Sequence, residues 1–355
     1  MTSCHIDLLL YVYISVVLMY FHIFLVIGIP QVPCFFIFGD SLVDSGNNNQ
    51  LVTTVKSDYL PYGIDFPQGV TGRFTNGRTI ADILGELLGF DEYIPTYANV
   101  TDQHLSQGVN YASGGSGIRE ETGSHMGGRI SFHKQLLNHH SVVSRLFRLQ
   151  QNKTFTREHL SKCIYIVITG SNDYINNYLK PTIYPTSRMY TTHQYAKILV
   201  KQYSRQLKSL YNLGGRKIAV FGLGLIGCAP AEISAFGTDG KPCVESINHA
   251  VKQFNNKLKP IVDELNVHNP DAKFTFINVT GISLQKGRRL TNVPSCILRT
   301  DGQCAQTTVN SPFRSLSMYY DGYHPTEVAN IHVAKMSYNA VSPMDASPYD
   351  INHLV

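Results

Sequence analysis

Four short runs of β-branched and aromatic residues recur along this chain, and longer segments with helical periodicity separate them. The runs are residues 34–38, 163–169, 217–221 and 273–278, and continuous apolar runs of this length are typical of strands buried on both faces. The separating segments are amphipathic: they place apolar side chains at three- and four-residue spacing in residues 79–88, 193–213, 246–266 and 326–341. This alternation predicts an α/β fold, with a parallel sheet covered by helices on both faces.

Composition limits the function classes that remain open. The chain is 43% hydrophobic, which is too apolar for a disordered protein. Its net charge of +5 over 355 residues comes without a long run of Lys and Arg, so we expect no nucleic-acid partner. No internal repeat, low-complexity tract or linker interrupts the pattern, and we expect one domain over residues 34–355.

Residues 1–33 differ from the rest of the chain. They contain a long apolar stretch that ends in a Gly- and Pro-containing segment, which favours a secretory signal peptide. The segment before the stretch carries Asp7 and no Lys or Arg, and the stretch is long enough to cross a bilayer, so a retained membrane anchor stays open. Three glycosylation sequons, at Asn99, Asn152 and Asn278, agree with secretion when they are taken together with the leader.

The chain has seven cysteines, one of which, Cys4, lies in the leader. Cys34 and Cys163 stand in the strand-like runs and are interpreted as buried thiols. The other four form two close pairs in loop sequence, which an oxidising compartment would make disulfides: Cys228 with Cys243 and Cys296 with Cys304. Neither pair has the spacing or the His partner of a zinc site, and we expect no metal.

Residues suited to serine-dependent hydrolysis follow the predicted strands. Ligands of open parallel sheets bind beyond the carboxyl ends of the strands, and Ser41 comes just after the first strand. Asp321 and His324 are three residues apart, so one turn can bring the carboxylate against the imidazole. Gly115 can present a backbone N–H at close approach, and Asn172 follows the second strand with an amide donor.

Taken together and in order, these segments resemble the plant branch of the GDSL esterase/lipase family, a group of SGNH hydrolases. The resemblance covers nearly everything after the leader and rests on five blocks, residues 36–49, 110–118, 170–173, 222–230 and 321–330. It implies a flavodoxin-like three-layer α/β/α sandwich with a mostly parallel sheet. It also implies an extracellular enzyme, in the cell wall or apoplast, which is expected to act as a monomer without a cofactor.

The resemblance also implies a role for each candidate residue. Ser41 would be the nucleophile, His324 the general base, and Asp321 the residue that orients His324. The backbone N–H groups of Ser41 and Gly115 and the side chain of Asn172 would form the oxyanion hole. Relatives act on lipid esters, acetylated polysaccharides or small acyl esters, and some transfer the acyl group to an alcohol.

The fold and two further sequence patterns also allow other interpretations. A non-catalytic binding protein on this fold is the alternative, and replacement of a site residue would favour it, but none is replaced. Gly222, Gly224 and Gly227 form a dinucleotide-type glycine pattern, yet the sequence after them does not continue as a helix, which argues against a nucleotide site. Among the remaining histidines, the residues at 125, 133, 139 and 140 lack acidic or Cys companions and are expected on the surface.

Overall fold

The computed structural model describes residues 13, 29–284, 290–309 and 311–355. The predicted leader therefore lies almost wholly outside the described residues. None of the described helices combines the length and hydropathy that crossing a membrane requires.

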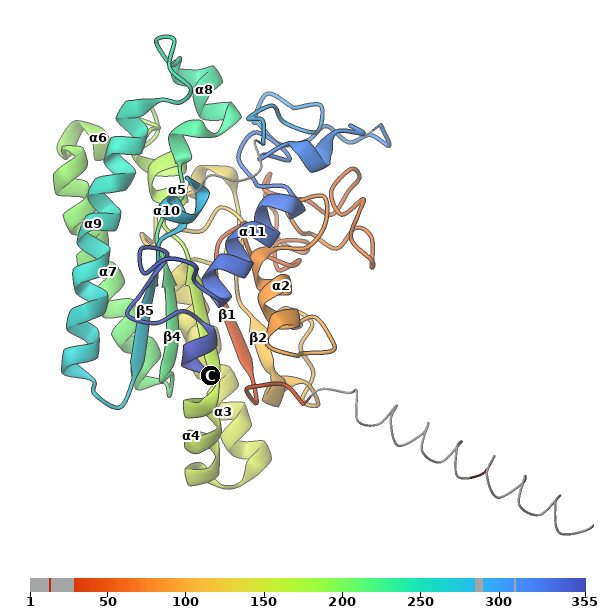
Figure 1. Ribbon diagram of the computed structural model, residues 1–355, viewed down its shortest axis with the longest axis vertical. Helices are drawn as coiled ribbons and strands as arrows, with labels where there is room; N and C mark the ends of the chain where they lie inside the picture. The colour runs from red at the N-terminus through yellow and green to blue at the C-terminus, as the bar shows by residue number, and fades with distance from the viewer. Residues whose placement is uncertain (1–12, 14–28, 285–289, 310) are drawn as a thin grey trace, which may run out of the picture.

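A six-stranded sheet crosses the molecule in the order β2-β1-β3-β4-β5-β6 (Figure 1). The first five strands are parallel, and β6 pairs antiparallel with β5. The strands are β1 Phe35–Gly39, β2 Gly108–Asn110, β3 Ile164–Ile168, β4 Lys217–Phe221, β5 Lys273–Ile277 and β6 Ala346–Ser347. The four predicted runs are confirmed as β1, β3, β4 and β5. The edge strands β2 and β6 were not predicted, because three and two residues are too short to show a pattern.

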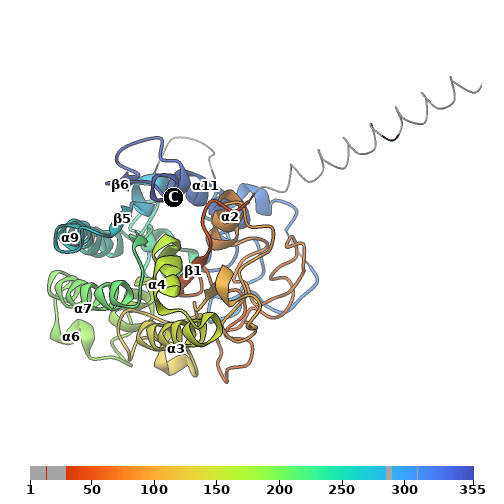
Figure 2. The ribbon, with the colours of Figure 1, turned by 90° about the horizontal axis from the view of Figure 1, so that it is seen from below.

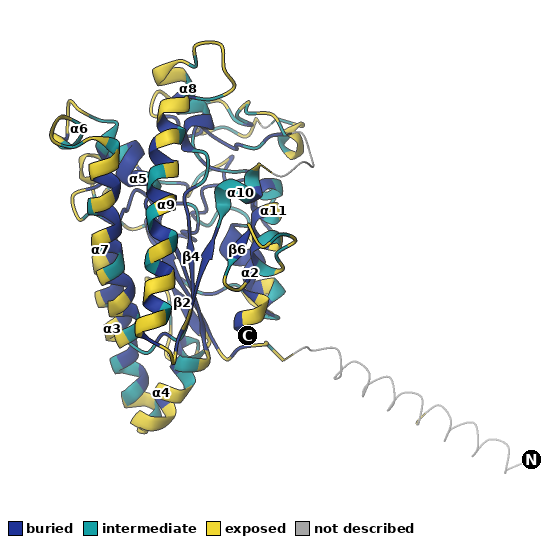
Figure 3. Ribbon diagram, turned by 60° about the vertical axis from the view of Figure 1, so that its left-hand side comes forward, coloured by how far each residue is buried: buried dark blue, intermediate teal, exposed yellow. Residues whose placement is uncertain are grey.

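Helices cover both faces of this sheet (Figures 1 and 2). Successive strand residues point to opposite faces, so Phe36 and Phe38 of β1 join one core while Phe35 and Ile37 join the other. The first core packs against α3 Phe132–Gln150, α7 Thr192–Asn212 and α9 Glu245–His268; the second packs against α2 Ile80–Leu87 and α11 Glu327–Tyr338. The result is a three-layer α/β/α sandwich, with buried strands and helices exposed along their outer sides (Figure 3).

Local sequence explains where the long helices begin. Thr79 and Asp82 form a capping box at the start of α2, in which each side chain bonds the backbone N–H of the other residue. Thr191 and Gln194 do the same at the start of α7. The remaining α-helices of the described residues are α4 Lys153–Lys162, α5 Ser171–Asp173, α6 Thr186–Met189, α8 Pro230–Phe236 and α10 Val279–Ser283.

Helix α3 was not predicted, and it corrects one expectation about histidine. His139 is fully buried and does not lie on the surface. It packs among aromatic rings, and its Nδ1 lies 3.0 Å from the Tyr111 hydroxyl. Burial lowers the pKa of His139 to about 3, so the ring stays neutral. Gln135 is buried on the same helix, and these two polar residues interrupt the apolar periodicity that would have revealed α3.

The described cysteines form three disulfides. Cys228 is joined to Cys243 and Cys296 to Cys304. The interpretation of Cys34 and Cys163 as free thiols was wrong, because these residues form the third disulfide. They precede the neighbouring parallel strands β1 and β3 at the same end of the sheet, which brings their Cα atoms to 4.7 Å across a separation of 129 residues.

Candidate active site

The candidate residues meet at the carboxyl ends of the strands. Ser41 follows β1, Gly115 follows β2, and Asn172 lies in α5 just after β3. Asp321 and His324 come from the loop that leads into α11. All except Asp321 line one cavity of about 450 Å³, and Asp321 lies buried behind His324.

The turn that carries Ser41 is held at its base by Gly39. A Cβ atom at Gly39 would lie 2.4 Å from the carbonyl oxygen of Ile168 on the adjacent strand, so the close approach of the chain requires glycine there. The buried amide of Gln135 binds both sides of this residue: the Gly39 N–H donates to Oε1 at 3.0 Å, and Nε2 donates to the Gly39 carbonyl at 2.7 Å. Helix α3 therefore fixes the end of β1 from which Ser41 projects.

Asp44 connects this turn to the loop after β2. Its Oδ1 accepts hydrogen bonds from the N–H groups of Gly46 and Asn47, both at 2.8 Å, and its Oδ2 accepts from Gly114 N–H at 2.9 Å. Asn47 Nδ2 also donates to the carbonyls of Asn110 and Ala112, at 2.9 and 2.8 Å, so Asp44 and Asn47 together join the Ser41 turn to the β2 segment.

Ser41, His324 and Asp321 form a continuous hydrogen-bonded chain. His324 Nε2 lies 2.8 Å from Ser41 Oγ, and His324 Nδ1 lies 2.7 Å from Asp321 Oδ2. Asp321 Oδ1 accepts from the backbone N–H groups of Tyr323 and His324, each at 2.8 Å, which fixes the carboxylate within its own turn. This arrangement can move a proton from Ser41 to a histidine whose orientation is already set.

The environment keeps Asp321 ionised although it is fully buried. Burial by itself pushes the pKa of Asp321 up, but the adjacent His324 ring, the Tyr62 hydroxyl and the Tyr323 N–H outweigh it and hold the pKa below its usual range. Ser41 and His324 are 7% and 8% exposed, so a substrate can reach Ser41 Oγ while bulk water is largely excluded.

The structure distinguishes Gly115 from its neighbour Gly114. The N–H of Gly114 is occupied by Asp44, whereas Gly115 lines the cavity with a positive φ of 78°. Such a φ is accessible to glycine with little strain. Of the two adjacent glycines, Gly115 is the one placed to offer its N–H to a ligand.

Asn172 has its amide orientation set by two bonds. Its Nδ2 donates to the Ser116 carbonyl at 3.0 Å, and its Oδ1 accepts from Asn176 Nδ2 at 2.7 Å. Because Ser116 O can only accept, the nitrogen of Asn172 must face it, and the second hydrogen of that nitrogen remains for the cavity. Asn176 lies at a kink in the π-helical turn Tyr174–Tyr178, directly after α5.

The cavity is lined mainly by apolar side chains from both layers of the sandwich. They include Leu42, Val55, Met126, Ile175, Leu223, Ile226, Val279 and Val333. Such a lining with a few convergent polar groups suits an organic ligand with an apolar part.

Asp40 is the buried acid next to Ser41. Its Oδ1 accepts from Leu42 N–H at 3.0 Å, while Oδ2 has no hydrogen-bond partner among the described residues. Burial raises the pKa of Asp40 to about 7, although the Leu42 N–H and the nearby His324 both act to lower it. Asp40 therefore changes charge near neutral pH, close to the histidine that contacts Ser41.

One further cluster could in principle bind a metal. Ligand atoms of Cys34, His159 and Cys163 lie within 4.8 Å of one another. The two sulfurs are joined in a disulfide, and His159 Nε2 lies 2.8 Å from the Ser106 carbonyl. Because a disulfide does not supply the thiolates that metals bind, these residues do not fit a metal site.

Sequence reasoning missed the residues that hold the site together. Gln135, Asn176 and Tyr62 each bond a predicted site residue or its turn, yet each stands in a segment without a local motif. Only the heptad-like spacing of Leu136, Val143 and Leu146 could have placed Gln135 on a helix.

Comparison with known proteins gives a consistent result. Residues 35–336 match the family described as GDSL-like Lipase/Acylhydrolase. The chain is 49% identical over 334 residues to the GDSL esterase/lipase At1g29670 of Arabidopsis thaliana, a match that covers 91% of this chain and 92% of the relative. It is 46% identical to the GDSL esterase/lipase At5g45670 of the same plant, with 92% of each chain covered.

The family match spans the five parallel strands, the cavity lining and every candidate residue from Ser41 to His324. The chain therefore belongs to the GDSL-like lipase/acylhydrolase family of carboxylic-ester hydrolases.

Proposed function

We propose that the protein hydrolyses carboxylic esters through an acyl-enzyme on Ser41. The observation that carries this proposal is the 2.8 Å contact between Ser41 Oγ and His324 Nε2, with Asp321 on the other ring nitrogen. His324 takes the proton of Ser41 as Oγ attacks the acyl carbon, and returns it to the alcohol that leaves. Water then attacks the acyl-enzyme, again with His324 as general base.

The negative charge that develops on the acyl oxygen needs donors placed in advance. We assign the backbone N–H groups of Ser41 and Gly115 and the Nδ2 of Asn172 to this oxyanion hole. Neighbouring contacts fix the Asn172 amide, and the Gly115 N–H borders the cavity. Donors fixed in this way need no reorganisation during the reaction, which is the main source of their effect.

We further propose that the mature protein is extracellular after removal of the leader. Three disulfides fit an oxidising compartment, and Asn99 and Asn152 are exposed as glycosylation requires. Asn278 is half-buried, and its Nδ2 donates to the Met344 carbonyl at 2.9 Å. We therefore expect glycans mainly at the first two sequons, which mass spectrometry of the secreted protein tests together with its new N-terminus.

The catalytic proposal is tested with the full chain expressed in a secretory host. Release of p-nitrophenol from acetate, butyrate and palmitate esters is compared for the wild type, Ser41→Ala and Ser171→Ala. Ser171 is the matched control, because it lines the same cavity but is not the serine that His324 contacts. We expect hydrolysis by the wild type and Ser171→Ala, and none above background by Ser41→Ala. Equal rates for folded wild type and Ser41→Ala would refute the proposal.

A further inference from the structure

Asp321 has a second side-chain partner besides the histidine. The hydroxyl of Tyr62 lies 2.6 Å from Asp321 Oδ2, the same oxygen that contacts His324 Nδ1 at 2.7 Å. Tyr62 comes from a loop that is 259 residues away in the sequence. The carboxylate oxygen that faces the histidine is therefore shared between two donors.

The direction of the Tyr62 hydrogen bond follows from its other contact. The backbone N–H of Cys304 lies 3.0 Å from the Tyr62 oxygen, and an N–H can only donate. The Tyr62 oxygen must therefore accept from Cys304, which leaves the hydroxyl hydrogen for Asp321. Tyr62 is thus a donor to the carboxylate by construction.

The Tyr62 ring has little freedom to leave this position. It is fully buried and makes edge contacts with Tyr59, Phe74 and Tyr320 at centroid distances of 5.3, 6.1 and 5.8 Å. A hydroxyl on so fixed a ring acts as a permanent part of the carboxylate's surroundings.

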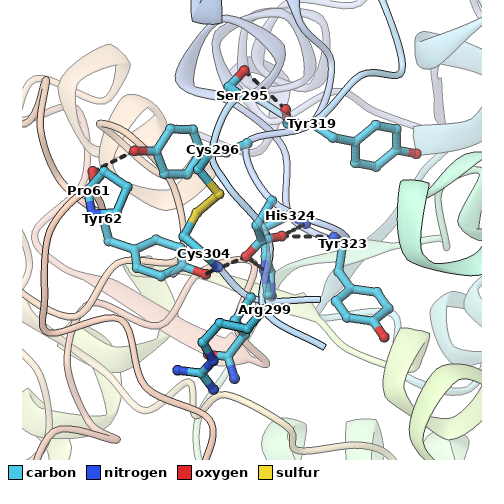
Figure 4. The surroundings of a disulfide bond; sticks show 12 residues. Pro61, Tyr62, Ser295, Cys296, Arg299, Cys304, Tyr319, Tyr323 and His324 are labelled. Carbon is cyan, nitrogen blue, oxygen red and sulfur yellow. Dashed lines mark hydrogen bonds and ion pairs between the residues drawn. A yellow bond between two sulfur atoms is a disulfide. The ribbon is translucent and has the colours of Figure 1, made fainter. Parts of the chain in front are cut away.

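The loop that supplies the Cys304 N–H is itself closed. The Cys296–Cys304 disulfide joins its two ends across eight residues, and the Tyr59 hydroxyl donates to the Cys304 carbonyl at 2.8 Å. The bridge and the Tyr59 bond hold the Cys304 N–H in place against the Tyr62 oxygen. Figure 4 shows Tyr62 together with Cys296 and Cys304.

We propose that Tyr62 is a positioning residue of the catalytic machinery. The disulfide-closed loop 296–304 holds Tyr62 against Asp321, and the Tyr62 hydroxyl limits how much of the carboxylate's charge acts on His324. This inference rests on the proposed function of Ser41, His324 and Asp321. A hydrogen bond from Tyr62 draws charge on Oδ2 away from the histidine, so the protonated imidazole is held less tightly than it would be by a carboxylate oxygen with no other donor.

Removal of the Tyr62 hydroxyl then has a signature that general loosening would not produce. In Tyr62→Phe the whole charge of Oδ2 faces His324, which favours the protonated imidazole. The acid limb of the pH profile should move to higher pH by up to about one to two units, which is the full value of one hydrogen bond to a charged group. A purely structural role would lower the rate at every pH without moving the limb.

Other titratable and charged groups surround this pair and must be considered. Those that act on Asp321, His324 or Tyr62, directly or through a neighbouring tyrosine, are Asp40, Asp58, Tyr59, Asp65, Glu232, Arg299, Asp301, Arg314, Tyr320 and Tyr323. Burial raises the pKa of Tyr59 to about 12 and raises the pKa values of Tyr320 and Tyr323 further, so these three stay neutral during the experiment. Burial also raises the pKa values of Asp40 and Glu232 to about 7, and their contributions are removed by repeating the comparison in an Asp40→Asn/Glu232→Gln background.

The test measures how fast a fluorophosphonate modifies Ser41 between about pH 5 and 9, the range in which a histidine titrates. This reaction needs no knowledge of the natural ester. The full-length wild type, Tyr62→Phe and Tyr165→Phe are compared. Tyr165→Phe is the matched control, because it removes the hydroxyl of another fully buried tyrosine, one that donates to the Leu160 carbonyl and does not contact Asp321.

We expect the acid limb to move upward in Tyr62→Phe and to stay in place in Tyr165→Phe. If Tyr62→Phe does not fold, 3-fluorotyrosine placed at position 62 keeps the ring and strengthens the donor, so the limb should move to lower pH. An unchanged limb in a folded variant at position 62 overturns the role of Tyr62 while leaving Ser41 as the nucleophile. Failure of the folded wild type to react at Ser41 would overturn both proposals.

Discussion

The contribution of Asn172 to catalysis can be worked out from its contacts. Asn172→Ala removes the one side-chain donor assigned to the oxyanion, while the Ser41 and Gly115 N–H groups remain. Loss of a single donor of this kind lowers kcat by about 100- to 1000-fold, or about 2.7–4 kcal/mol of transition-state stabilisation. KM should change little, because the donor binds the developing oxyanion more strongly than the neutral carbonyl of the substrate.

The effect should depend on the orientation of the amide as well as its presence. Asn176 Nδ2 donates to Asn172 Oδ1 at 2.7 Å, so Asn176→Ala removes the bond that keeps the oxygen turned away from the cavity. The Ser116 carbonyl still holds Asn172 Nδ2. We expect an intermediate loss of about fivefold, since one neutral hydrogen bond contributes about 1 kcal/mol.

The assay is steady-state hydrolysis of p-nitrophenyl butyrate, with kcat and KM determined separately for the wild type, Asn172→Ala and Asn176→Ala. Thermal melts show whether each variant is folded. A kcat for folded Asn172→Ala within about threefold of the wild type would refute the oxyanion assignment, because a threefold loss of kcat is far smaller than the loss expected for an oxyanion donor. A loss that appeared only as a raised KM would place Asn172 in substrate binding instead.

Three further predictions concern stability. Burial raises the pKa of Asp40 from 3.8 to about 7, so between these pH values the folded protein keeps a proton that the unfolded chain releases, and stability is lost as pH rises from about 4 to 7. In urea denaturation Asp40→Asn should therefore be more stable than the wild type by about 1–4 kcal/mol at pH 8 and nearly equal in stability near pH 4. Equal differences at both pH values would contradict this. The double variant Cys34→Ser/Cys163→Ser should lose about 2–5 kcal/mol in the free energy of unfolding, because the bridge it lacks closes a loop of more than a hundred residues. It should keep the wild-type kcat, because that bridge lies at the end of the sheet away from Ser41. Gln135→Ala should cost about 1–3 kcal/mol and also reduce kcat, since Gly39 loses both of its hydrogen bonds to the Gln135 amide at the base of the Ser41 turn. Unchanged kcat would show that α3 does not hold that turn.

Much of the fold follows from local pattern. The strands β1, β3, β4 and β5 are continuous apolar runs, and the burial of such a run can be predicted from its own residues without knowledge of the rest of the chain. Helix α3 was not predicted, because Gln135 and His139 stand on its buried face, where each forms a hydrogen bond with a group from another element. Their burial depends on tertiary partners that no local window contains.

The same division applies to the site. Asp321 and His324 could be paired from their spacing, because one turn brings their side chains together. Tyr62 could not be connected to Asp321 in the same way, since the contact spans 259 residues and depends on how two loops pack. The Cys34–Cys163 disulfide was missed for the same reason, whereas the two bridges of short sequence separation could be inferred from proximity along the chain.

The most direct test of the central claim is to trap the covalent intermediate. The wild type and His324→Ala are mixed with p-nitrophenyl acetate, quenched in acid within the first turnovers, digested and mapped by mass spectrometry. The account predicts that the wild-type peptide containing Ser41 gains the mass of one acetyl group on that serine, and that the same peptide of His324→Ala stays unmodified on this time scale. An acetyl group on another residue, or hydrolysis by the wild type with Ser41 never modified, would contradict it.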